Sequence, residues 1–202
     1  MDLNKIIQRA RALLVTPRTE WPVIAAEPAT VQGLYRDYFM ILAAIPPICQ
    51  FVKVSILGYA WHGFRIYRLG IGPGLTAAMV EYVASLAAIY VLAIIVEALA
   101  PNFGGESNRL QALKVSGYAY TASWIAGVGL ILPGISGLIA LAGAIYSVYL
   151  FYLGLPSTMK VLPERAAGLT AIVGISGFVL GWIIAVVIGV ITGMIWSDGW
   201  PT

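Results

Sequence analysis

Cysteine, histidine and charged residues are scarce in this chain of 202 residues. Its one cysteine, Cys49, excludes an intrachain disulfide, and with His62 as its one histidine the chain has no set of soft ligands for zinc or iron. Charged residues make up 10% of the chain, against about 25% in an ordinary soluble domain. A soluble globular domain is therefore excluded, and we expect no metal site, no cofactor and no catalytic residue.

Apolar residues take the place of the missing charges, with 60% of the chain in the hydrophobic class and a mean hydropathy of +0.88. A bilayer core about 30 Å thick needs roughly 20 such residues per helix. The uncharged or nearly uncharged runs predict five membrane-spanning helices, two of which are separated by the turn Leu132-Pro133-Gly134. The predicted spans are Tyr38–Leu57, Leu75–Leu99, the two halves of Val115–Met159, and Ala166–Ser197.

The predicted fold is therefore all-α: an integral membrane five-helix bundle with a short amphipathic interfacial helix at its N-terminus. Residues 1–33 are expected to form a cytoplasmic or interfacial segment, residues 34–195 the membrane domain, and residues 196–202 a short external tail. Apolar residues recur at helical spacing near the N-terminus, interleaved with cations, which is typical of a helix lying in the headgroup layer. An ordinary juxtamembrane anchor is the alternative. These apolar residues are Leu3, Ile6, Ile7, Ala10, Leu13 and Leu14.

Basic residues near the span ends set the expected orientation, because cytoplasmic loops are enriched in Lys and Arg. Nine of them fall on one side of the predicted bundle, and only Arg65 and Arg68 fall on the other. The N-terminus is therefore expected to be cytoplasmic and the C-terminus external. The nine are Lys5, Arg9, Arg11, Arg18, Arg36, Arg109, Lys114, Lys160 and Arg165.

Ionisable residues inside the predicted spans are costly, and by default they indicate a function. Lys53 and Glu81 are expected at similar depth on antiparallel neighbours, either as an ion pair or as two groups that share a water-filled cavity. Such a pair either fixes the packing of the helices or takes part in transport. Glu97 and Arg36 lie near the other ends of the same two helices, where they either pair likewise or, as interfacial charges, simply extend to the headgroup layer.

Three further patterns bear on helix packing. The hydroxyl-bearing residues of the third span, Tyr118 to Ser123, are expected to hydrogen-bond across helices. Pro46-Pro47 must kink or break the first span, because proline lacks a backbone N–H and its ring clashes with the preceding turn. In the fifth span, Gly177 and Gly181, and again Gly189 and Gly193, predict a close approach of helix backbones, within the bundle or between protomers.

Two connections carry the most specific sequence signals. The first reads Leu99-Ala100-Pro101-Asn102-Phe103-Gly104-Gly105-Glu106-Ser107-Asn108, and the second ends the fourth span with Tyr152-Leu153-Gly154-Leu155-Pro156-Ser157-Thr158-Met159-Lys160. Together with Tyr118-Ala119-Tyr120-Thr121 and Pro133, these segments resemble the Yip-one domain of the Yip family, in its bacterial branch. Ala122 departs from the family pattern, which commonly has proline there, so we expect no helix kink at that point.

The resemblance implies five spans with a cytoplasmic N-terminus, which agrees with the count from the apolar runs, and a place in the bacterial inner membrane. It supplies no catalytic residue. The two motif turns lie on the same side and are expected either to form a partner-binding surface or simply to end their helices. The residues of this candidate surface are Pro101, Phe103, Gly104, Gly105, Gly154, Leu155 and Pro156.

Three classes of function follow from these features. The favoured one is a non-enzymatic organising module that binds membrane lipids, other membrane proteins or a second copy of itself. The alternative is a small transporter, channel or lipid-handling protein that uses Lys53 and Glu81. A membrane enzyme is the weakest, because His62 has no acidic or cysteine neighbour in the sequence. The pI near 9.0 reflects cations at the span ends, so lipid contact and no nucleic-acid binding is expected.

Overall fold

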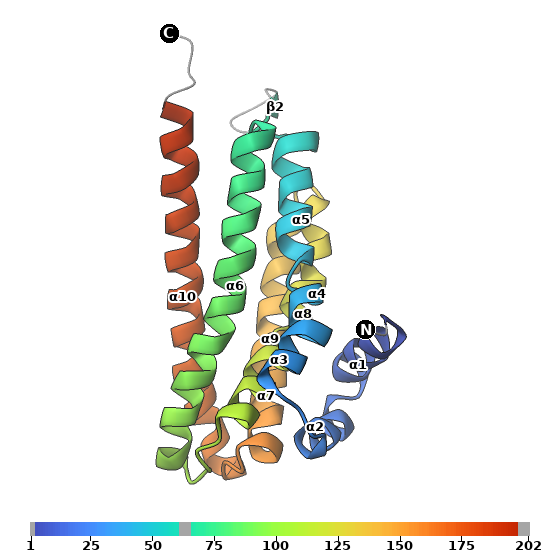
Figure 1. Ribbon diagram of the computed structural model, residues 1–202, viewed down its shortest axis with the longest axis vertical. Helices are drawn as coiled ribbons and strands as arrows, with labels where there is room; N and C mark the ends of the chain where they lie inside the picture. The colour runs from blue at the N-terminus through green and yellow to red at the C-terminus, as the bar shows by residue number, and fades with distance from the viewer. Residues whose placement is uncertain (1–2, 61–65, 198–202) are drawn as a thin grey trace.

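The computed structural model describes residues 3–60 and 66–197, and these are almost entirely helical (Figure 1). Four helical stretches are long and apolar enough to cross a membrane: Val31–Leu57, Ile71–Phe103, Ser136–Thr158 and Pro163–Val190. The strands are β1 (Tyr59–Ala60) and β2 (Ile66–Tyr67), which pair antiparallel as a short hairpin. The predicted helical membrane architecture is confirmed.

The first apolar stretch is broken, as the two prolines predict. It consists of α3 (Val31–Leu34), the π-helical turn η1 (Tyr35–Phe39), α4 (Met40–Leu42), α5 (Ile45–Phe51) and a second π-helical segment, η2 (Val52–Leu57). Pro46 and Pro47 lie in the first turn of α5, where their missing N–H groups cost no intrahelical bond. Short π-helical segments are rare and frequently mark functional positions.

The remaining long helices are α6 (Ile71–Leu99), which ends in the 3-10 turn η3 (Ala100–Phe103), α9 (Ser136–Thr158) and α10 (Pro163–Ser197). Between α6 and α9 the chain forms α7 (Arg109–Ala119), α8 (Thr121–Ala126) and the 3-10 segment η4 (Gly127–Ile131). Ala122 lies within α8, so there is no kink at that residue, but the helix is interrupted two residues earlier. The interruption is at Tyr120, whose N–H bonds to the Gly117 carbonyl three residues back.

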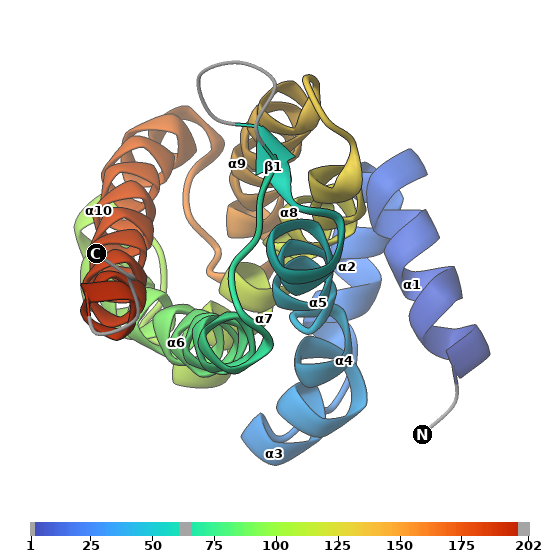
Figure 2. The same cartoon turned by 90° about the horizontal axis from the view of Figure 1, so that it is seen from above.

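Two short helices, α1 (Leu3–Val15) and α2 (Pro17–Ala26), dock on the side of the bundle far from α10 (Figure 2). The apolar face predicted for the first of them is divided in the structure. Ile6, Ala10 and Leu13 are buried against the bundle, whereas Leu3 and Ile7 are exposed. The N-terminal segment forms a helix, and half of its apolar surface packs against the bundle of the same chain.

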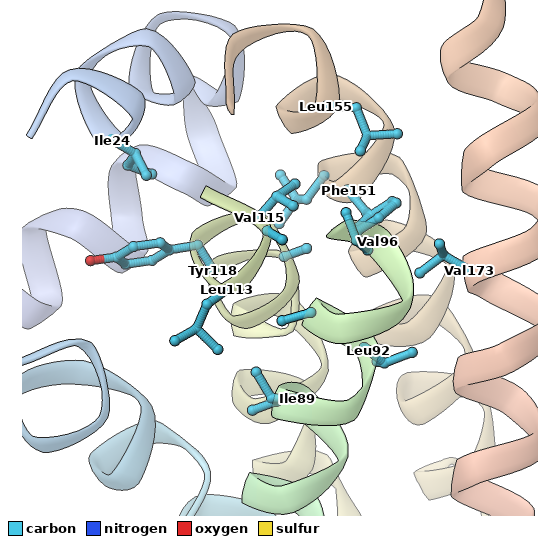
Figure 3. Close-up of a cluster of buried hydrophobic side chains, with 14 of the residues drawn as sticks. Ile24, Ile89, Leu92, Val96, Leu113, Val115, Tyr118, Phe151, Leu155 and Val173 are labelled. Carbon is cyan, nitrogen blue, oxygen red and sulfur yellow. The ribbon is translucent and has the colours of Figure 1, made fainter. Parts of the chain in front are cut away.

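Packing differs between the two ends of the bundle. We call the end with α1, α2, α7 and the turns at residues 100–108 and 159–163 the motif end, and the end with β1, β2 and the turn at residues 132–135 the hairpin end (bottom and top of Figure 1). The largest buried side chains, among them Trp21, Leu113 and Leu155, lie at the motif end. Figure 3 shows Leu113 and Leu155 in this cluster. In α7 every residue from 112 to 119 is buried, whereas α10 has none buried between 174 and 190.

Candidate functional site

The two motif turns lock onto each other at the motif end. The Glu106 N–H donates to the Met159 carbonyl at 2.8 Å, and Lys160 Nζ donates to Glu106 Oε1 at 2.8 Å. Gly104 has φ +76°, a left-handed conformation that favours glycine. A Cβ on Gly105 would lie 2.7 Å from the Met159 carbonyl oxygen, so only glycine fits there. The glycine pair is therefore explained by the turn geometry and by a close backbone approach.

The second motif points into the protein, which corrects the expectation of a continuous partner surface. Leu155 is fully buried, and a Cβ on Gly154 would lie 2.8 Å from the indole ring of Trp21. These two residues face inward because α2 packs against α9 at this point, with Trp21 on the flat surface that Gly154 leaves. Of the seven candidate surface residues, only Pro101 and Gly104 are exposed, while Phe103, Gly105 and Pro156 are half-buried.

Lys114 fastens α2 to the core of the motif end. Its side chain is 1% exposed, and Nζ donates to the backbone carbonyls of Ile24 at 2.8 Å, Ala25 at 3.3 Å and Glu27 at 2.6 Å. These carbonyls belong to the last turn and cap of α2, which have no partner within the helix. A cation at a helix C-terminus is also favoured by the helix dipole. Lys114 was counted from the sequence among the basic residues near the span ends; in the structure it is a buried cation that fixes α2.

Other polar ties hold the N-terminal helices in place. The Tyr146 hydroxyl donates to the Leu14 carbonyl near the end of α1 at 2.7 Å, and Gln111 Nε2 donates to the Ala25 carbonyl at 2.9 Å. Arg9 pairs with both Glu20 and Glu27. Burial lowers the pKa of Arg9, but its hydrogen bond and charge interaction with Glu27 outweigh the burial and raise it above the ordinary value. Arg9 thus joins α1 to α2 by charge, and the hydrogen bonds of Tyr146 and Gln111 fix the two helices to the membrane bundle.

A polar groove of about 650 Å³ runs between α1 and the start of the first span, and we call it the Arg9 groove. Asp37 and Tyr38, which line it, belong to the π-helical turn η1. Lys5 and Asp37 bring opposite charges to the groove, and neither makes an ion pair within the described part of the chain. The lining is completed by Ile6, Arg9, Glu27, Pro28, Ala29, Thr30, Gly33, Leu34 and Tyr118.

Lys53 and Glu81 share a cavity at the hairpin end but form no ion pair among the residues that the structure describes. Lys53 lies in the π-helical segment η2, and its Nζ donates to Ser136 Oγ at 3.2 Å. The cavity, of about 740 Å³, lies between η2, α6 and α10, and we call it the Lys53 cavity. Apart from Lys53, Glu81 and Gln50, its lining is apolar or glycine.

Two smaller cavities continue toward the motif end. The Pro46 cavity, of about 320 Å³, shares Pro47, Glu81 and Leu130 with the Lys53 cavity, so the two adjoin. The Ser116 cavity, of about 370 Å³, meets the Pro46 cavity at residues that line both: Tyr120, Ser123 and Gly177. Ser116 Oγ is buried and finds no hydrogen-bond partner in the described part of the protein. A series of hollows therefore follows α10 along the bundle.

The glycine repeats of α10 line these hollows, and the close backbone approach predicted within the bundle is not found at Gly181 or Gly193. The alternative, a close approach between protomers, stays a prediction. A Cβ on Gly181 or Gly193 would meet nothing within 4 Å. Gly177 does face a neighbour, since its Cβ would lie 3.2 Å from the Tyr120 hydroxyl oxygen. The spacing of the glycines predicts a smooth face on the helix. Whether a second helix packs on that face depends on the tertiary structure.

Two other predicted contacts have opposite outcomes. Glu97 pairs with Arg109 at the start of α7 and not with Arg36, because α7 folds back alongside the end of α6. The interhelical hydroxyl bonds are confirmed. The Tyr38 hydroxyl lies 3.0 Å from Thr121 Oγ1, and Ser123 Oγ lies 2.8 Å from Ser147 Oγ. His62, Arg65 and the tail from residue 198 lie outside the described residues.

Comparison with known proteins matches residues 11–185 of this chain to the Yip1 domain. Two curated relatives are similar over nearly their whole length: the inner membrane protein YohC of Escherichia coli strain K12 and its counterpart in Escherichia coli O6:H1 strain CFT073. Each is 27% identical over 187 residues, which cover 91% of this chain and 93% of the relative. No solved structure matches the chain.

Proposed function

The chain belongs to the Yip1 domain family of membrane proteins, and from that premise we propose that it is a non-enzymatic organising module of the bacterial inner membrane. In this proposal it binds another membrane protein at its motif end. The observation that carries the proposal is the Arg9 groove, a mixed-charge recess between a docked N-terminal helix and the first span.

The proposal includes a five-span topology. The segment Arg109–Ile131 serves as the additional crossing, since it runs between α6 and α9 as α7, α8 and η4. The motif end faces the cytoplasm, because the described basic residues other than Lys53 and Arg68 belong to its helices and turns or, for Arg36 and Arg165, to the first turns of the helices that begin there. The N-terminus is then cytoplasmic and the C-terminus periplasmic.

The groove suits a polypeptide partner because its polar groups are already held in position. Lys114, Gln111 and Tyr146 fix α1 and α2 to the bundle, so the groove wall does not have to order when a partner binds. Lys5 and Asp37 carry charges that a partner segment of the opposite pattern can pair, and such complementarity gives specificity. A second copy of the chain is the other protein that this surface could receive.

The test is a mild-detergent purification of tagged protein, with the stoichiometry of every retained protein measured, on the wild type and on two charge reversals. Asp37→Lys alters the groove, whereas Glu164→Lys alters an exposed acidic residue of the motif end that does not line it. We expect a stoichiometric foreign membrane protein whose recovery falls about tenfold in Asp37→Lys and is unchanged in Glu164→Lys. Recovery that is equal in both variants, or retention of the protein itself with lipid only, overturns the proposal.

The second candidate is a small transporter, channel or lipid-handling protein, and the Lys53 cavity favours it. An intramembrane acid and base that line one hollow without pairing are a recognised sign of a ligand or ion path. Proteoliposome flux separates the two candidates. Flux that Glu81→Gln abolishes while the folded protein persists supports transport, and no flux above empty liposomes supports the organising module.

A further inference from the structure

The Lys53 cavity is lined by two groups of opposite charge that form no ion pair with each other. Lys53 uses its ammonium for one bond, to the neutral Ser136 hydroxyl, and Glu81 has no ion pair in the described part of the chain. Both line a hollow of about 740 Å³ that is otherwise apolar except for Gln50. Charges within a membrane are costly unless they meet a counter-charge or water. The cavity therefore calls for an occupant that carries both signs.

The cavity lies where a lipid can reach it. It is bounded by η2, α6 and α10, three elements of the candidate membrane spans, with α10 beside α6 in both views (Figures 1 and 2). On its outward surface α10 exposes Phe178, Trp182 and Val186, as expected for a helix bathed in hydrocarbon. Leu69, which also lines the cavity, lies just outside the spans, so the cavity extends from the end of the spans into the membrane region, as a lipid headgroup with its chain requires.

The lining of α10 fits an extended chain. Gly177, Gly181, Ala185, Gly189 and Gly193 recur every fourth residue, and all of them line the Pro46 or the Lys53 cavity. This stripe covers 17 residues, or 16 steps of ~1.5 Å, about 24 Å in all, which is most of the hydrocarbon thickness of a bilayer. No helix covers Gly181, so the stripe forms a smooth trough with room for an acyl chain.

We propose that the Lys53 and Pro46 cavities form one binding site for a phospholipid with a zwitterionic headgroup that carries a primary ammonium. The phosphate binds Lys53, with Ser136 as its neighbour, and the ammonium binds Glu81. One acyl chain lies in the Pro46 cavity against the glycine stripe. This site is independent of the Arg9 groove, which lies beside α1 at the motif end, so a partner at the groove and a lipid at the cavity can each be present without the other.

Lipid retention after exchange tests the proposal. The purified protein is equilibrated in mixed micelles with equimolar phosphatidylethanolamine, phosphatidylcholine and phosphatidylglycerol, and retained lipid is measured by native mass spectrometry. We expect phosphatidylethanolamine to exceed each of the others about tenfold. Lys53→Met is expected to lose all phospholipid, and Lys53→Arg to retain it. Glu81→Gln is expected to keep phospholipid but to lose the preference, so that the ratio of phosphatidylethanolamine to phosphatidylglycerol approaches one.

Matched variants separate the site from general effects on the fold. Gly181→Leu fills the trough, whereas Gly137→Leu adds the same side chain at a position that also meets nothing within 4 Å but lines neither cavity. The exposed pair Lys160 and Glu106, changed to Met and Gln, controls for the loss of one charge of each sign. Retention must fall in Gly181→Leu and stay in the three controls, with helicity by circular dichroism equal in all. Equal retention by wild type and Lys53→Met, a preference that survives Glu81→Gln, or free inorganic phosphate that displaces the lipid overturns the proposal.

Discussion

The motif end and the hairpin end of the bundle are built on different principles. At the motif end α7 is buried along eight consecutive residues, and its lysine and glutamine bind the carbonyls of a helix that is 90 residues away in the chain. At the hairpin end α10 has no buried residue between 174 and 190, and cavities lie along its inner side there. The first end is a solid scaffold, and the second is a set of helices around a hollow.

The two intramembrane or buried lysines show the same contrast. The Lys114 ammonium donates to three backbone carbonyls, so its hydrogen-bonding capacity is fully occupied in fixing α2. Lys53 bonds one hydroxyl and faces a cavity. A satisfied buried cation stabilises a fold, whereas a half-buried cation with unused hydrogen-bonding capacity is available to a ligand. In this protein the environment of a charge, and not its depth alone, therefore decides whether the charge has a structural or a functional role.

Removing apolar volume is expected to give the largest difference between the ends. Leu113 at the motif end is 0% exposed, whereas Ile175 on α10 is 66% exposed. We expect Leu113→Ala to lower the free energy of unfolding by about 3 kcal/mol, through lost burial and the cavity left behind. Ile175→Ala is expected to change it by less than about 0.5 kcal/mol. Unfolding by titration with a denaturing detergent measures both, and equal losses would contradict the contrast.

Adding a methyl group to a glycine is expected to have opposite signs at the two ends. Gly154→Ala pushes a Cβ to 2.8 Å from the Trp21 ring and from Val115 Cγ2, and overpacking of this kind costs about 1–3 kcal/mol. Gly181→Ala meets open space, so the gain in helix propensity makes it neutral or stabilising by up to about 1 kcal/mol. Thermal unfolding in mild detergent distinguishes the two, and a destabilising Gly181→Ala would show that the trough is in fact filled by protein.

Deleting one interhelical hydroxyl is expected to have the smallest effect. Tyr38→Phe removes the bond to Thr121 that joins the first span to α8, and bonds of this kind in membrane proteins contribute roughly 0.6 kcal/mol on average. Tyr149→Phe is the control, because no hydrogen bond of that hydroxyl is found in the described part of the structure and the side chain is exposed. A double-mutant cycle of Tyr38→Phe with Thr121→Val gives the coupling energy between the two hydroxyls. The same cycle of Tyr149→Phe with Thr121→Val should give a coupling energy of zero.

Much of the architecture could be predicted because composition and proline position act locally. The apolar runs identified the membrane class, and Pro46-Pro47 marked the break in the first span, since both effects depend on neighbouring residues alone. The motif turns could be located from the sequence for the same reason. Their role could not, because the inward orientation of Gly154 depends on Trp21, which lies 133 positions earlier in the chain.

The roles of particular charges and glycines were beyond the sequence for a related reason. Counting basic residues near span ends treats Lys114 and Lys160 alike, yet one is enclosed by α2 and the other is exposed. Lys53 and Glu81 line one cavity, and the sequence had placed them at similar depth on antiparallel neighbours. Whether they pair depends on how far α6 stands from η2, a distance that the residue pattern does not encode.

One measurement tests the contrast between the ends most directly: the loss of stability in Lys114→Met compared with that in Lys53→Met, by unfolding in the same lipid-free detergent. We expect Lys114→Met to lower the free energy of unfolding by about 3 kcal/mol, because the carbonyls at the end of α2 lose their donor. We expect Lys53→Met to change it by less than about 1 kcal/mol, because this variant gives up one bond to a hydroxyl. An equal loss of stability in the two variants would contradict the contrast between the motif end and the hairpin end. A Lys114→Met variant as stable as the wild type would contradict it too.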